Sequence, residues 1–164
     1  MKPAWALLLG AVSLAASARP DWLDEFRGRD GRWVAQRPDG STVTLHYRTI
    51  AGGSVVVETW QGGTPAETQT VYHLDRGALV ATHYCAQGNQ PRLRLERATE
   101  DMQWFRWRDK DGGTGELRKR AHLDRLRFQY QHDGGLRRME AYVAPDQKEE
   151  ISELVFYRQP AGIE

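Results

Sequence analysis

The amino-acid sequence predicts an all-β protein: an antiparallel β-barrel of about eight to ten strands, preceded by one short helix. Turn signals such as Asp39-Gly40, Gly62-Gly63 and Asp133-Gly134 recur about every ten residues along the chain. The runs between them have the length of strands, and several alternate between apolar and polar residues. Strands in this meander order favour a closed barrel, because closure removes exposed sheet edges, although a sandwich of two sheets would show the same pattern.

The composition is that of one globular domain, with 40% hydrophobic, 27% charged and 10% aromatic residues. The 23 Lys and Arg residues are balanced by 22 Asp and Glu residues, so no excess of positive charge would attract nucleic acid, and we predict no nucleic-acid partner. The single cysteine, Cys85, cannot form an intramolecular disulfide. The fold must therefore be held by its core.

The first 18 residues have the pattern of a secretory signal peptide. Lys2 supplies a positive start, residues 4–16 form an apolar stretch, and residues 16–18 read Ala-Ser-Ala, a small-residue cleavage site. The apolar stretch is shorter than the roughly 20 residues that span a bilayer, and Cys85 lies too far along the chain to carry a lipid at the mature start. We expect cleavage near Ala18, export to the periplasm or the medium, no stable membrane anchor, and a single domain over residues 19–164.

The first predicted element of the mature chain is a short helix over residues 22–26. Asp21 can cap its N-terminus, and Asp24 and Glu25 place acidic side chains in its first turn. Trp22 and Phe26 lie one turn apart and share a face. A helix of this length could plug one end of a barrel.

The strands follow. The second predicted strand shows the alternation most clearly, since Val43, Leu45 and Tyr47 share one face while Thr44 and His46 share the other. We expect strands near residues 31–37, 41–50, 54–61, 67–75, 78–86, 91–98, 102–109, 119–131, 136–144 and 151–158.

The opening of the first strand, Gly31-Arg32-Trp33, resembles the Gly-x-Trp signature of lipocalins and their relatives, the calycin barrels. In those families the tryptophan packs at the closed barrel end against an Arg or Lys of the last strand, and Arg158 has the matching position and parity here. The resemblance implies that the Arg158 guanidinium stacks on the Trp33 indole and donates to backbone carbonyls around it.

Two further segments resemble a bacterial family of exported lipocalin-like domains of unknown function. One is Thr-His-Tyr-Cys-Ala-Gln-Gly-Asn-Gln-Pro-Arg over residues 82–92, and the other is His-Leu-Asp-Arg-Leu over residues 122–126. The second segment usually contains a further histidine in that family, where this chain has Asp124. The resemblance implies a lipocalin-like fold and brings no activity with it.

The residues that could carry chemistry are Cys85, His83 and His122. In an extended strand His83 and Cys85 project from the same face, and His122 and Asp124 share a parity with Leu126, which places them at one end of the barrel interior. They could converge as metal ligands or as a thiol and imidazole pair, or they could be satisfied core histidines and a small buried thiol. No paired Cys-x-x-Cys occurs, so we predict no metal site.

The most favoured function is binding of a small, at least partly apolar or amphipathic molecule in the barrel. Asn89 and Gln90 could overhang the barrel mouth, or they could only form a tight turn before Pro91. Trp104 and Trp107 lie on opposite faces of one strand, so one of them is expected to line the cavity. The candidate lining and anchoring residues are Tyr47, His83, Tyr84, Asn89, Gln90, Trp104, His122, Phe128 and Tyr130.

Three alternatives stay open. The first is an enzyme that uses Cys85 as nucleophile with His83 or His122 as base. The second is a barrel that binds haem without covalent attachment through one histidine, although the sequence requires no cofactor. The third is a chaperone-like interaction protein. The sequence leaves the ligand, the openness of the cavity and the oligomeric state undetermined.

Overall fold

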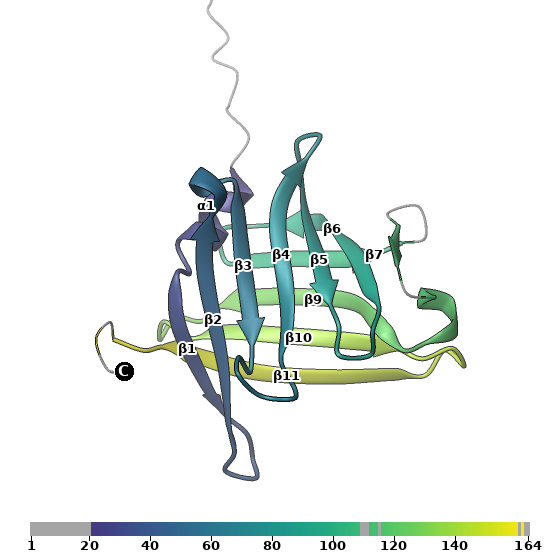
Figure 1. The fold of residues 1–164 in the computed structure, drawn as a ribbon. Coiled ribbons are helices and arrows are strands. Elements are labelled where there is room, and N and C mark those ends of the chain that lie inside the picture. The colour runs from purple at the N-terminus through teal and green to yellow at the C-terminus, as the bar shows by residue number, and fades with distance from the viewer. Residues whose placement is uncertain (1–20, 109–111, 115, 161, 163–164) are drawn as a thin grey trace, which may run out of the picture.

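Ten antiparallel strands close into a β-barrel in the computed structural model, which describes residues 21–108, 112–114, 116–160 and 162 (Figure 1). The predicted signal peptide lies outside the described residues. Each strand pairs with the next along the sheet, and β5 pairs with β6 to close the ring. The strands are β1 (Gly31–Gln36), β2 (Thr42–Ile50), β3 (Val55–Trp60), β4 (Thr68–Asp75), β5 (Ala78–Tyr84), β6 (Gln90–Ala98), β7 (Met102–Trp107), β9 (His122–Tyr130), β10 (Leu136–Val143) and β11 (Glu149–Arg158).

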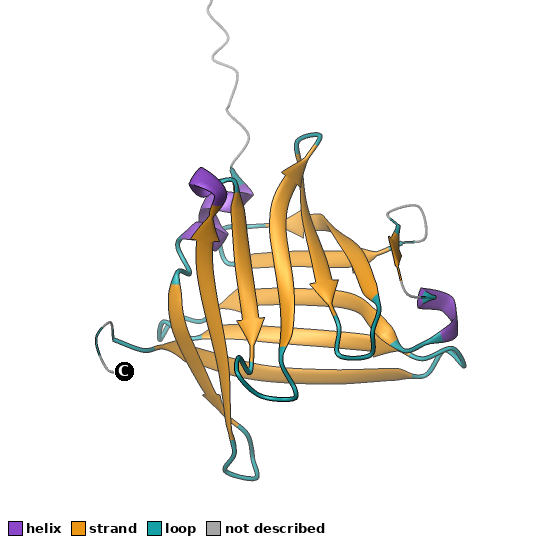
Figure 2. Cartoon of the chain, in the orientation of Figure 1, coloured by secondary structure: helices purple, strands orange, loops and turns teal. Residues whose placement is uncertain are grey.

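The predicted all-β barrel is thus confirmed, and strands dominate the fold (Figure 2). The very short β8 (Gly113–Thr114), which was not predicted, pairs with the start of β6. Among the residues that the structure describes, single-turn 3-10 helices lie at Ala51–Gly53 and Leu117–Lys119. Within the described part of the chain, no helix is long and apolar enough to cross a membrane.

The helix α1 (Trp22–Arg27) plugs one end of the barrel. Its cap is the predicted one, because the Asp21 carboxylate accepts a hydrogen bond from the Leu23 amide at 3.0 Å. Phe26 is fully buried, and its ring centroid lies 4.2 Å from that of Tyr72 and 5.4 Å from that of Phe128. This aromatic cluster fills the half of the barrel nearest the helix.

The closed end is sealed by the contact expected between Trp33 and Arg158. The two residues are paired across β1 and β11, and the Arg158 guanidinium carbon lies 5.2 Å from the Trp33 ring centroid. The guanidinium donates to the carbonyl oxygens of Gly28 at 2.5 Å and Asp30 at 2.8 Å. The Trp33 indole donates to the carbonyl of Arg29 at 2.8 Å. This geometry matches a lipocalin-like barrel.

A bulge in β9 changes which side chains face inward. Between Ala141 and Tyr142 the register with β10 shifts, so that Tyr142 lies opposite Leu123 and Asp124 becomes an extra residue. Leu123 consequently joins the core, with no exposed surface. The predicted inward direction of His122 and Asp124 is therefore wrong, because the alternation on which it depends is interrupted at the bulge.

Candidate functional site

The candidate site is a cavity of about 310 Å³ at the barrel end opposite α1. The hairpin loops after β1, β3 and β5 all reach this end (Figure 1). Trp60 and Tyr142 give the cavity aromatic walls, and Glu140, Glu150 and Ser152 add carboxylate and hydroxyl oxygens. The full lining is Arg37, Trp60, Ala66, Thr68, Gln87, Ala121, Glu140, Tyr142, Glu150 and Ser152.

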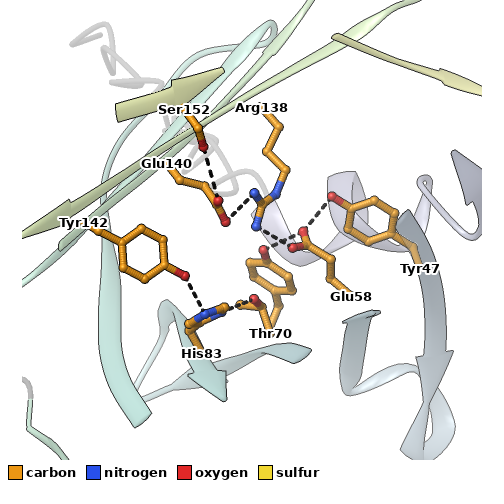
Figure 3. Close-up of polar contacts among 9 residues, drawn as sticks. Tyr47, Glu58, Thr70, His83, Arg138, Glu140, Tyr142 and Ser152 are labelled. Carbon is orange, nitrogen blue, oxygen red and sulfur yellow. Dashed lines mark hydrogen bonds and ion pairs between the residues drawn. The ribbon is translucent and has the colours of Figure 1, made fainter. Parts of the chain in front are cut away.

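Beneath this cavity, the barrel interior holds a network of charged side chains (Figure 3). Arg138 on β10 donates to Glu58 on β3 at 2.8 Å and forms an ion pair with Glu140 at 2.5 Å. The second carboxylate oxygen of Glu58 accepts hydrogen bonds from the Tyr47 hydroxyl at 2.7 Å and the Tyr72 hydroxyl at 2.9 Å. Arg138 and Glu58 are 2% and 1% exposed, so the pair is screened from water.

The network fixes the charge of each member. Burial raises the pKa of Glu58, but the positive charge of Arg138 and the hydrogen bonds to the carboxylate outweigh this effect and hold the pKa below its usual range. The pKa values of Tyr47 and Tyr72 are raised, first by burial and then by the negative charge of Glu58. Glu58 is thus ionised and the two tyrosines remain neutral donors.

His83 lies beside this network and is neutral at pH 7. Its Nδ1 is 3.0 Å from the Thr70 hydroxyl, and its Nε2 is 3.0 Å from the Tyr142 hydroxyl. Burial lowers the pKa of His83 to about 4, although the negative charge of Glu140 opposes this shift. The imidazole therefore connects Thr70 on β4 to the cavity wall at Tyr142.

Tyr142 also brings Cys85 close to His83. The pKa of the Tyr142 hydroxyl is raised by burial first, and then by the negative charge of Glu140 and by the nearby Cys85. Of the three residues predicted to converge, His83 and Cys85 thus both lie near Tyr142, a residue that sequence reasoning did not include. His122 is not part of this cluster, since its ring lies against Trp107.

The other predicted lining residues are distributed around the barrel. Tyr84 is 50% exposed, and Trp104 lies beside Arg127, whose guanidinium carbon is 6.0 Å from the ring centroid. Phe128 belongs to the aromatic cluster near α1, and the Tyr130 hydroxyl accepts a hydrogen bond from Arg29 at 3.0 Å. None of these four residues lines the described cavity.

The two predicted amide anchors hold loops. Asn89 is fully buried and donates to the Ala121 carbonyl at 2.8 Å, while the Gln90 amide oxygen accepts a hydrogen bond from Thr114. The turn between them and β5 has the predicted tight form, with Gly88 at a φ of 76°. The neighbouring Gln87 reaches the cavity instead.

Sequence reasoning missed the interior charges. Glu58, Arg138 and Glu140 each share a parity with inward apolar neighbours, which was the available signal. Arg29 is also fully buried, with its guanidinium carbon 3.9 Å from the Phe26 ring centroid. Charged residues seldom occupy such positions unless they are paired, so the partner has to be known before the side chain can be placed inside.

The environment of His83 makes this residue poorly suited to acid–base catalysis. A histidine with a pKa of about 4 is a weak base at neutral pH, and Tyr142 lies between it and Cys85. Both ring nitrogens of His83 are occupied by hydroxyl groups, so neither is free to ligate a haem iron in this arrangement. Among the described residues, no three His, Cys, Asp or Glu side chains are grouped to hold a metal ion.

Comparisons with protein-family models and with curated proteins found no match for this chain.

Proposed function

We propose that this protein is exported and then binds a small amphipathic molecule in the cavity at the open end of the barrel. The observation that carries the proposal is the pairing of aromatic walls with acceptor oxygens in one cavity, directly above a buried charge network. The cavity volume of about 310 Å³ is at the lower end of the range typical of small-molecule sites. The bound molecule is therefore expected to be small.

The apolar part of such a molecule would pack on Trp60. This indole is already oriented by its neighbours, because its ring centroid lies 5.8 Å from that of Phe156 and 5.0 Å from the Arg138 guanidinium carbon. Because the Trp60 side chain is already fixed by these contacts, it loses little conformational entropy when a ligand packs on it.

The polar part would donate hydrogen bonds to the carboxylates. One oxygen of Glu140 is paired with Arg138, whereas the other accepts only a long hydrogen bond of 3.5 Å from Ser152. Glu150, from β11, lines the same cavity. An N–H or O–H group on the ligand can compete for these acceptors, and this requirement excludes purely apolar ligands.

Binding can be tested with N-phenyl-1-naphthylamine, an uncharged aromatic amine whose fluorescence rises in apolar surroundings. We expect saturable binding to the mature protein, weakened at least tenfold by Trp60→Ala. Trp104→Ala is the matched control, because Trp104 lies outside the cavity beside Arg127. Equal affinities of the two variants, with both shown to be folded by circular dichroism, would contradict the proposed site.

The natural ligand can be sought by native mass spectrometry of protein recovered gently from the exported fraction, together with its absorption spectrum. A reproducible added mass that Trp60→Ala removes would identify the ligand class. The intact mass also tests export, because cleavage after Ala18 leaves a chain that begins at Arg19. An uncleaved chain found only inside the cell would contradict this part of the proposal.

A further inference from the structure

A second cavity, of about 410 Å³, lies where β7 and β9 meet the hairpin between β10 and β11. It is separate from the open-end cavity, and the two share no lining residue. Along β11, Glu149 lines the second cavity and the next residue, Glu150, lines the first, as alternation across a strand requires. The wall formed by these strands therefore has a cavity on each side.

The bulge in β9 builds this second cavity. With regular pairing, His122 and Asp124 would share the inward face with Leu126. The extra residue at Asp124 leaves Leu123 in the core and allows His122 and Asp124 to line the cavity instead. Bulges that redirect side chains in this way occur often beside functional sites.

His122 presents an unpaired acceptor at this place. Its Nδ1 lies 3.2 Å from the carbonyl oxygen of Arg120, which can only accept, so in the neutral ring Nδ1 carries the proton. Nε2 is then a lone-pair acceptor. The residue is only 6% exposed, and no other described residue hydrogen-bonds Nε2. A buried acceptor without a partner costs free energy that a ligand donor would recover.

Trp107 lines the same cavity and packs against the His122 ring. Its indole N–H donates to the carbonyl of Gly112 at 3.0 Å, and its ring centroid lies 4.6 Å from that of His122, with an angle of 72° between the planes. Both rings are thus held by main-chain oxygens. The two side chains are therefore fixed before a ligand binds, and they offer it one ring face and one hydrogen-bond acceptor.

The charges around the cavity are already balanced. Arg125 pairs with Asp124 at 3.6 Å and also with Glu149. Arg106, which lines the cavity, lies opposite Arg125 across β7 and β9. The negative charges of two carboxylates are therefore balanced by two guanidinium groups, so the cavity has no excess charge that would favour a charged ligand.

We propose that this second cavity binds an uncharged, planar aromatic heterocycle that carries an N–H group. The N–H donates to Nε2 of His122, and the ring packs on Trp107. This site is independent of the ligand proposed for the open end.

The test compares indole with 1-methylindole, which has the same ring system but no N–H to donate. Binding is followed by nuclear magnetic resonance of the mature protein with ¹⁵N-labelled histidine, since the Nε2 signal of His122 reports directly on a new hydrogen bond. We expect indole to shift this signal in a saturable manner and 1-methylindole to bind about tenfold more weakly. Because this control is in the ligand, it requires no variant to fold.

A protein-side comparison separates this cavity from the open end. His122→Leu should weaken indole binding about tenfold, whereas His46→Leu, at an exposed position on β2, and Trp60→Ala, in the other cavity, should not. Equal binding of the two indoles would overturn the proposed hydrogen bond. Absence of any shift at His122 up to the solubility limit of indole, or loss of indole binding in Trp60→Ala alone, would overturn the site.

Discussion

His83 should make the protein sensitive to mild acid. The folded imidazole has a pKa of about 4, whereas the same group in the unfolded chain titrates near 6.5. The unfolded state therefore binds more protons between these values, and stability must fall as the pH decreases through this window. The full difference corresponds to about 3 kcal/mol, of which about 2 kcal/mol is lost between pH 7.5 and pH 5.

The cause is the closed environment of this one side chain. Protonation would place a positive charge in a buried position whose two partners, the Thr70 and Tyr142 hydroxyls, carry no negative charge to balance it. The nearby charge of Arg138 also disfavours it, and Glu140 offsets only part of the cost. The acid sensitivity should accordingly disappear when the imidazole is replaced.

Urea denaturation at a series of pH values measures this contribution. Between pH 7.5 and pH 5, the free energy of unfolding should fall by about 2 kcal/mol less in His83→Gln than in the unmodified protein, whatever the stability of the variant at pH 7.5. His46→Gln, at an exposed position on β2, is the control and should follow the unmodified protein. If His83→Gln also follows the unmodified protein across this range, the reasoning about the buried imidazole is refuted.

Two further predictions concern the interior charges and the closed end. Arg138→Met leaves Glu58 without its buried cationic partner and should lower the free energy of unfolding by about 3–5 kcal/mol. Arg137→Met, at the partly exposed next position, is the control and should change this free energy by less than about 1 kcal/mol. Similar losses for the two variants in urea denaturation would contradict the role of the buried ion pair. Trp33→Ala should lower the free energy of unfolding by about 3–5 kcal/mol, because the indole is buried under a guanidinium. A decrease well under about 1 kcal/mol, or one no larger than that caused by Trp104→Ala, would contradict the role of Trp33 in sealing the barrel.

Much of the fold could be predicted from the sequence because its signals are local. Gly-containing turns delimit most of the hairpins, although residues 99–101 and 144–148 contain no glycine, and all ten predicted strands occur within a few residues of their expected positions. The helix cap at Asp21 depends on one side chain and one neighbouring amide, so it could also be predicted. Even the contact between Trp33 and Arg158, which are far apart in sequence, followed from a resemblance and from parity.

The candidate site was less predictable because its determinants are not local. Glu58 and Arg138 are 80 residues apart, and each is an unremarkable polar position until its partner is known. The bulge at Asp124 carries no glycine or proline to signal it, yet it reverses the direction of His122. Parity arguments are reliable only as far as the next irregularity in the strand.

The interior charges also change what kind of ligand the barrel can take. The expectation was a partly apolar ligand held inside the barrel by aromatic lining and polar anchors, with the openness of the cavity undetermined. In the structure, Phe26 and the rings around it fill the half near α1, and Arg138 with its two carboxylates occupies the region beneath the mouth. A ligand that entered deeply would have to separate Glu58 from Arg138, and leaving either charge unpaired would cost several kcal/mol. The network therefore forms a floor beneath the cavity, and the proposed ligand would be confined to the outer part of the barrel, where it would contact Trp60 and Tyr142 without disturbing the buried ion pair.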